Sequence, residues 1–244
     1  MDLDLKGRTA LITGGSRGIG LAVACRLAVE GCHLHLAARS AADLETARNK
    51  IVEAHRVNVT IHPVDLSRTD AAVELARTCG ALDILINNAG AIPAGTIGTL
   101  DDATWRSAWD LKVFGFISLI REIYPGMCGR KRGVIVNVVG TAGERPTAGY
   151  IAGSMANAAL MAMSRAVGAE SLDHGVRVVA VNPGATDTER IFTILKARAK
   201  SELGDENRWP ELTKRLPGGR LGSAEEIANM VTFLCSDRSG YTSG

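Results

Sequence analysis

Short apolar runs alternate along this chain with longer segments in which apolar residues recur at helical spacing. The short runs predict buried strands at residues 8–13, 32–38, 58–64, 82–90, 133–139 and 175–184. The longer segments predict helices at 18–31, 41–55, 69–80, 101–124, 150–172 and 223–236. The strands are apolar throughout rather than alternating, which is typical of a parallel sheet covered by helices on both faces. We therefore expect a doubly wound α/β fold with three layers, built as one domain over residues 1–244.

The pattern loosens between residues 187 and 219. This segment predicts two short helices, interrupted by polar residues and by Pro210. It follows the last predicted strand, and ligands bind beyond the carboxyl ends of the strands in sheets of this kind. We interpret the segment as a small helical lid over a substrate site. A helical excursion on the surface is the alternative.

Composition and charge narrow the class of protein. The 244 residues carry a formal net charge of +2, which indicates neither a nucleic-acid nor a membrane partner. No apolar run approaches the ~20 residues of a membrane span, and the charged start, MDLDLKGR, is unlike a signal peptide. The five cysteines and five histidines show no ligand spacing, so we expect free thiols in a reducing, cytoplasmic compartment and no metal site. A small-molecule substrate is the expected partner.

A glycine-rich loop, TGGSRGIG at 13–20, lies between the first predicted strand and the first helix. Gly14 permits a tight turn, while Gly18 and Gly20 permit close approach of the backbone to a phosphate and of the helix to the sheet. The start of the helix then offers free N–H groups to a pyrophosphate. The loop predicts a Rossmann-type dinucleotide site rather than a merely structural turn.

The end of the second predicted strand indicates which dinucleotide binds. An acidic residue there would accept hydrogen bonds from a ribose 2′-hydroxyl, but this chain has Ala38 followed by Arg39. Arg17 lies within the glycine loop. Two guanidinium groups suit a 2′-phosphate, so we expect NADP(H) in preference to NAD(H). The alternative is that Arg39 is only a solvated residue at the start of a helix.

Three motifs in this order, TGGSRGIG, then NNAG at 87–90, then NPGATDT at 182–188, resemble the short-chain dehydrogenase/reductase family from residue 5 to the end of the chain. The resemblance implies an NADP(H)-dependent oxidoreductase acting on a hydroxyl or carbonyl group, and a homotetramer or homodimer that packs through the helices at 101–124 and 150–172. It also implies a set of cofactor-binding residues: Gly14, Ser16, Arg17, Gly18, Ile19, Gly20, Arg39, Asp65, Leu66, Asn87, Ala89, Gly90, Asn157, Pro183, Gly184 and Thr188.

The chain departs from the family at its active site. The family's tetrad is Asn, Ser, Tyr and Lys, in which Tyr is the acid or base and Lys holds the nicotinamide ribose. An alignment without gaps puts Lys112 at the asparagine position, Gly140 at the serine position, Gly153 at the tyrosine position and Asn157 at the lysine position. A shifted alignment that matches Tyr150 to the tyrosine finds no lysine between residues 132 and 195. All four tetrad positions are therefore changed.

Three residues are candidates for the missing chemistry. Lys112 lies in an apolar helical stretch, and its ammonium is expected to enter the volume left at Gly153 and Asn157, where burial would bring its pKa towards neutrality. In that position the ammonium would donate a proton or hold the ribose. The alternative is that the Lys112 side chain is exposed to solvent. Tyr150 lies one helical turn before Gly153 and lines the substrate pocket or packs on its rim. Asn157 keeps a polar group for a ribose hydroxyl.

Three functions remain open. The first is an NADP(H)-dependent oxidoreductase with a relocated proton donor. The second is a cofactor-binding sensor or scaffold without redox turnover, which would explain the loss of the whole tetrad. The third is an isomerase or lyase on the same fold, with Glu144, Tyr150 or Lys112 as the base.

Overall fold

The predicted strands form one parallel sheet in the computed structural model, which describes residues 1–244. Its strands are β1 (Thr9–Thr13), β2 (His33–Ala38), β3 (Val59–Pro63), β4 (Ile84–Asn87), β5 (Gly133–Val138) and β6 (Val176–Val181). The order is β3-β2-β1-β4-β5-β6, and all neighbours are parallel. Successive strands are added on one side of β1 as far as β3, and on its other side from β4 to β6. In folds of this kind, ligands bind in the crevice at the point between β1 and β4 where the order switches. The expected Rossmann-type α/β fold is confirmed.

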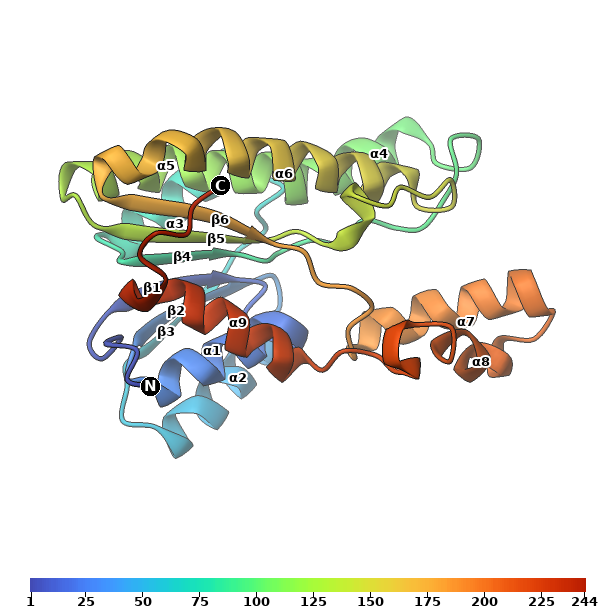
Figure 1. Ribbon diagram of the computed structural model, residues 1–244, viewed down its shortest axis with the longest axis horizontal. Coiled ribbons are helices and arrows are strands. Elements are labelled where there is room, and N and C mark those ends of the chain that lie inside the picture. The colour runs from blue at the N-terminus through green and yellow to red at the C-terminus, as the bar shows by residue number, and fades with distance from the viewer.

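Helices cover both faces of the sheet and complete three layers (Figure 1). One face is covered by α1 (Gly18–Val29), α2 (Ala41–Ala54) and α9 (Ala224–Cys235), around a core of 24 buried residues. The other face is covered by α3 (Ala71–Cys79), α5 (Gly115–Gly129) and α6 (Ile151–Ser171), around a core of 16. The sheet is therefore buried on both sides, which explains why its strands lack alternation.

Helices α2 and α9 each begin at a side-chain cap. The Ser40 hydroxyl accepts from the Asp43 N–H at the start of α2, and Ser223 and Glu226 form a capping box at the start of α9. The helix after the glycine loop differs, because Arg17 stands at its N-cap and makes no capping hydrogen bond. The N–H groups of this first turn are thus left for a ligand.

The helix expected at 101–124 is longer and less regular than the sequence suggests. It consists of α4 (Asp102–Trp109), a π-helical turn (Asp110–Phe114) and α5, which continues through Pro125 to Gly129. A proline inside a helix costs about 3 kcal/mol, but Met127 beyond it is fully buried in the core and holds the last turn in place. The π-helical turn contains Lys112 at its centre, and such turns often occur at functional sites.

The segment at 187–219 contains a long helix rather than two short ones. It consists of α7 (Glu189–Leu203), a 3₁₀ turn (Glu206–Arg208) and α8 (Trp209–Thr213). Pro210 lies in the first turn of α8, where its missing N–H breaks no helical hydrogen bond. Both helices project beyond the sheet and share a small core of their own, formed by Leu195, Ala199 and Leu212 (Figure 1).

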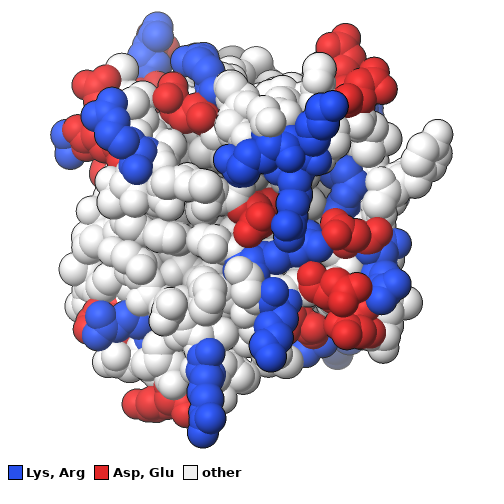
Figure 2. Space-filling view, turned by 90° about the vertical axis from the view of Figure 1, so that its left-hand side faces the viewer, with Lys and Arg blue, Asp and Glu red and all other residues white.

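The surface carries charges of both signs. Figure 2 shows the end of the molecule opposite α7 and α8, where lysine and arginine side chains lie next to aspartate and glutamate side chains. Three ion pairs join Arg8 to Asp237, Arg132 to Asp83 and Arg238 to Asp4. None of the helices has the length and hydropathy needed to span a membrane.

Candidate active site

The glycine loop turns tightly at the carboxyl end of β1. Gly14 has a φ of 65°, and a Cβ built on it would lie 2.8 Å from Nδ2 of Asn88 in the loop after β4. A Cβ on Gly20 would overlap the carbonyl oxygen of Gly14. Asn88 donates to the carbonyls of Thr13 and Gly14 and so holds the two loops together. Positions 14 and 20 of the glycine loop therefore have no room for a side chain, and a ligand can approach the backbone of the loop closely.

The first turn of α1 faces this crevice with uncapped N–H groups, flanked by the half-buried residues Ser16 and Ile19 and the exposed Arg17. A methyl carbon of Thr188, at the end of the segment that follows β6, would lie 3.3 Å from a Cβ on Gly18. A helix start with free donors and a positive dipole binds phosphate. These residues fit the pyrophosphate of a dinucleotide cofactor.

The remaining predicted cofactor residues line the same edge of the sheet. Arg39 is exposed just beyond β2, and Leu66 is buried beyond β3. The Asp65 carboxylate accepts from the backbone N–H of Ser67 at 3.0 Å and from its hydroxyl. The backbone hydrogen bond, followed by the Ser67 hydroxyl and the charge of Arg39, holds the pKa of Asp65 below its ordinary value.

The loops after β4 and β6 are fixed from within the fold. Asn87 is fully buried and donates to Oδ1 of Asn137 at 3.0 Å, and the Ala89 N–H donates to the Thr13 hydroxyl. The carbonyl of Pro183 accepts from the N–H of Thr141, whereas Gly184 has open space where a side chain would be. Both loops thus present a preformed backbone to the crevice.

Lys112 is buried, with 8% of its surface exposed, and its stem passes Gly90, on which a Cβ would lie 3.0 Å from Cδ of the lysine. Its Nζ donates to Oδ1 of Asn157 at 2.7 Å and to the carbonyl of Val139 at 2.8 Å. Burial, and secondarily the positive charge of Arg190, lowers the pKa of Lys112 from 10.5 to about 7. An ammonium has three N–H donors, so one remains after these two hydrogen bonds.

Asn157 is held at both ends of its amide. While Oδ1 accepts from Lys112, Nδ2 donates to the carbonyl of Gly140 at 3.2 Å. Gly140 has a φ of 123°, and a Cβ there would lie 3.0 Å from Nδ2 of Asn157. A serine at this position would therefore be strained and would crowd the asparagine. The position of the Asn157 amide therefore depends on a glycine at residue 140.

Tyr150 places its ring in the space next to Gly153. The residue precedes the first turn of α6, and a Cβ on Gly153 would overlap the Cε1 and Cζ atoms of the ring. The aromatic ring thus occupies the volume through which a side chain at position 153 would have to leave the helix. A phenol from one helical turn earlier thus lies beside Gly153.

One residue of the site gives no signal in the sequence. Arg190, in the first turn of α7, donates to the carbonyls of Gly90 and Ile92 at 2.7 and 2.6 Å and to the Tyr150 hydroxyl at 3.2 Å. It lies in a stretch of charged residues where solvation is the ordinary expectation. Only the fold shows that this arginine ties α7 to the crevice and that it contacts the phenol.

Two of the charged candidates are engaged elsewhere. Glu144 forms an exposed ion pair with Arg165 at 3.0 Å, and no hydrogen bond joins it to Tyr150 or Lys112. Arg17 faces Glu189 of α7 at 3.4 Å, with both side chains largely exposed. The chemistry available in the crevice is therefore a buried amine, a phenol and a guanidinium.

Comparisons with known proteins agree with this fold. Residues 8–198 match the family described as short chain dehydrogenase. The chain is 31% identical to 2-keto-3-deoxy-L-fuconate dehydrogenase of Xanthomonas campestris pv. campestris, covering 98% of this chain and 78% of the relative. It is 30% identical to the NADPH-dependent reductase BacG of Bacillus subtilis, covering 97% and 94%.

Among solved structures, L-sorbose reductase from Gluconobacter frateurii, in complex with NADPH and L-sorbose, superimposes with a TM-score of 0.91. It is 34% identical, and the match covers 100% of this chain and 95% of that chain. The family match spans most of the chain and includes the glycine loop and the loop after β4. On this evidence, the chain belongs to the short-chain dehydrogenase family.

Proposed function

We propose that the chain is an NADP(H)-dependent oxidoreductase that interconverts a hydroxyl and a carbonyl group, with Tyr150 as the proton donor and Lys112 as the cation that holds the nicotinamide ribose. One observation carries this proposal. The Lys112 ammonium lies against Asn157, at the family's lysine position, and the Tyr150 ring lies against Gly153, at the family's tyrosine position. The amine and the phenol are both present, but each is supplied from a different point of the chain.

The preference for NADP(H) has two supports. Arg39 and Arg17 offer positive charge where an acidic residue would favour NAD(H). Among the similar proteins, BacG is NADPH-dependent and the L-sorbose reductase structure contains NADPH. When bound, the nicotinamide supplies a hydride to the carbonyl carbon or takes one from the alcohol carbon.

Lys112 is suited to bind a ribose hydroxyl. Two of its donors are fixed by Asn157 and Val139, which orient the amine and leave the third donor for a ligand. Because its pKa lies at about 7, the group changes its charge close to neutral pH. Asn157 is then a positioning residue, since both ends of its amide are occupied by Lys112 and Gly140.

Tyr150 is suited to transfer the proton. During reduction its hydroxyl gives a proton to the substrate oxygen as the hydride reaches carbon, and during oxidation it takes the proton back. The phenolate formed by reduction accepts a charge-assisted hydrogen bond from the guanidinium of Arg190. We assign Arg190 as a positioning residue, because it acts on the reaction through Tyr150.

We also propose that residues 187–219 are a lid. Arg190 and Glu189, in its first helical turn, reach Tyr150 and the glycine-loop residue Arg17. The expected homo-oligomer through α4, α5 and α6 stays a proposal as well. Phe114, in the π-helical turn between α4 and α5, and Met155 of α6 are 53% and 48% exposed, which suits a subunit contact.

The test of the proposed function is a charge swap. NADPH oxidation by the wild type is followed with a panel of ketones and keto sugars. Lys112→Asn is expected to reduce kcat by about 100-fold or more, a typical contribution of a positioned catalytic group. The double variant Lys112→Asn/Asn157→Lys, which returns the cation to the family's position, is expected to recover part of that loss.

Tyr150→Phe is the matching test of the proton donor, and Tyr241→Phe, at an exposed tyrosine near the C-terminus, is its control. We expect Tyr150→Phe to lower kcat by at least about 100-fold while the affinity for NADPH stays within a factor of three. Tight NADPH binding by the wild type with no oxidation by any substrate would instead indicate a sensor or scaffold.

A further inference from the structure

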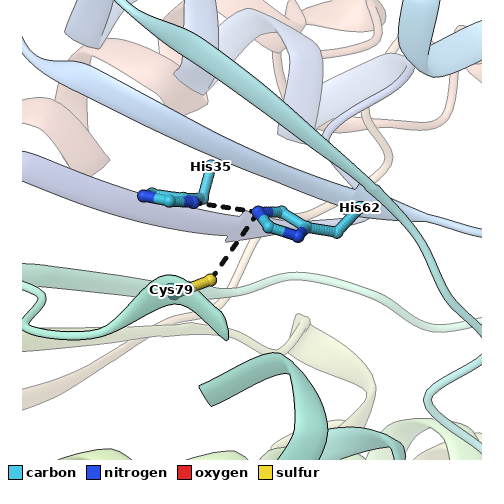
Figure 3. Close-up of side chains that lie close together, drawn as sticks. All are labelled: His35, His62 and Cys79. Carbon is cyan, nitrogen blue, oxygen red and sulfur yellow. Dashed lines mark hydrogen bonds between the residues drawn. The ribbon is translucent and has the colours of Figure 1, made fainter. Parts of the chain in front are cut away.

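Three potential metal ligands meet on the face of the sheet covered by α3, although their spacing in the sequence is irregular. His35 comes from β2, His62 from β3, and Cys79 is the last residue of α3 (Figure 3). Their ligand atoms all lie within 4.8 Å of one another. The expectation that the histidines and cysteines show no ligand arrangement holds for the sequence but not for the fold.

The nitrogen Nε2 of His62 is the centre of this cluster. It lies 2.8 Å from Nδ1 of His35 and 3.8 Å from Sγ of Cys79. The two rings are stacked, with their centroids 5.1 Å apart. Both histidines are half-buried, and burial lowers the pKa of each, which favours the neutral imidazole. Neutral imidazole is the form that binds a metal.

We propose that His35, His62 and Cys79 bind one Zn²⁺ ion, with water as the fourth ligand. Imidazole nitrogen and thiolate sulfur are the ligands that zinc prefers, and three protein ligands with one water form a common zinc arrangement. Both histidines are only half-buried, so water can supply the fourth ligand. The site holds no carboxylate, which disfavours Mg²⁺ and Ca²⁺.

The distances fit this ion after a rearrangement of the ligand side chains. Zinc bonds of about 2.05 Å to nitrogen and 2.3 Å to sulfur, at tetrahedral angles, separate two nitrogens by about 3.3 Å and a nitrogen from a sulfur by about 3.6 Å. The nitrogens must therefore move apart by about 0.5 Å and the sulfur approach His62 by about 0.2 Å, relative to the 2.8 and 3.8 Å found. The three ligand atoms lie within 4.8 Å of one another, so the His35 nitrogen and the Cys79 sulfur must approach by up to about 1.2 Å.

Burial raises the pKa of the Cys79 thiol to about 12, so the thiol is protonated without metal. Binding would replace the thiol proton by the Zn–S bond and release the proton to solvent. The ion would then link β3, an edge strand, to β2 and α3. None of the three ligands is one of the proposed cofactor-binding or catalytic residues, so the expected effect of the ion is on the stability of the fold.

Cobalt substitution tests this proposal directly. Metal-free protein is titrated with Co²⁺, and one equivalent is expected to produce a thiolate-to-cobalt charge-transfer band that added Zn²⁺ removes. Zn²⁺ alone is expected to raise the melting temperature of the wild type. Cys79→Ser should abolish the band, and His62→Gln should weaken binding at least tenfold.

Cys25→Ser, which changes a half-buried thiol of α1, is the control and should keep the band and the thermal shift. The proposal is overturned if Co²⁺ produces no band, or if Cys79→Ser and Cys25→Ser bind it equally. If Cys79→Ser does not fold, His35→Gln is tested in its place. An affinity of His35→Gln for Co²⁺ equal to that of the wild type would also overturn the proposal.

Discussion

The buried lysine predicts an unusual dependence of stability on pH. Lys112 has a pKa of about 7 in the folded chain, because burial and Arg190 disfavour its charge, against 10.5 when unperturbed. Below pH 7 both states carry the proton, and the folded state bears the full cost of burying the charge. Between pH 7 and 10.5 the unfolded chain binds one proton more than the folded chain, so the free energy of unfolding rises with pH.

The magnitude follows from that proton. One bound proton changes the free energy of unfolding by about 1.4 kcal/mol per pH unit, and the two pKa values give a gain of about 2 kcal/mol between pH 7 and 9. Lys112→Met removes the titrating group and with it this gain. It also removes the hydrogen bonds to Val139 and Asn157, which costs about 1–3 kcal/mol for each unpaired acceptor at every pH.

The assay is urea unfolding of the wild type and of Lys112→Met at pH 7, 8 and 9, without cofactor. The difference between the two proteins is the quantity to compare, because burial raises the pKa of Cys32 and Cys79 in both and the cysteines therefore add the same pH dependence to each curve. Between pH 7 and 9, the free energy of unfolding of the wild type should rise by about 2 kcal/mol relative to that of the variant. A difference that is constant with pH would mean that Lys112 titrates as an exposed lysine does, and would refute the reasoning.

Three further substitutions test other parts of the account. Gly153→Ala places a methyl group against the Tyr150 ring and should lower kcat at least tenfold without weakening NADPH binding, whereas Gly149→Ala, which meets open space, should match the wild type. Arg39→Asp should shift the ratio of kcat/KM values for NADPH and NADH at least tenfold towards NADH, and an unchanged ratio would remove Arg39 from the 2′-phosphate site. Arg177→Met should lower the free energy of unfolding by about 3 kcal/mol, because the buried guanidinium donates to Leu234, Ser236 and Ser239 around the end of α9. A loss below about 1 kcal/mol in urea would contradict that role.

The sheet and its cofactor edge could be predicted because they depend on local patterns. The apolar runs of the strands and the glycine loop each follow from the backbone geometry of a buried parallel sheet. The continuation of α5 through Pro125 could not be predicted in this way, because it depends on the burial of Met127 in the core between the helices and the sheet. The length of α7 depends likewise on its packing against α8.

The active site was only partly accessible from the sequence. Lys112 and Tyr150 could be singled out because the resemblance to a family predicts other residues at Gly153 and Asn157. Arg190 could not, since its contact with Tyr150 depends on where α7 leaves the sheet. The meeting of His35, His62 and Cys79 depends in the same way on the register between β2 and β3 and on the place where α3 ends.

The central claim is that the cation of the active site has moved from position 157 to Lys112, and a crystal structure of the NADP⁺ complex tests it most directly. We predict that Nζ of Lys112 lies within about 3.2 Å of a nicotinamide ribose hydroxyl and still contacts Asn157, with the Tyr150 hydroxyl on the side of the nicotinamide where substrate binds. A ribose held by other groups, with the ammonium bound only to Val139 and Asn157, would contradict the claim.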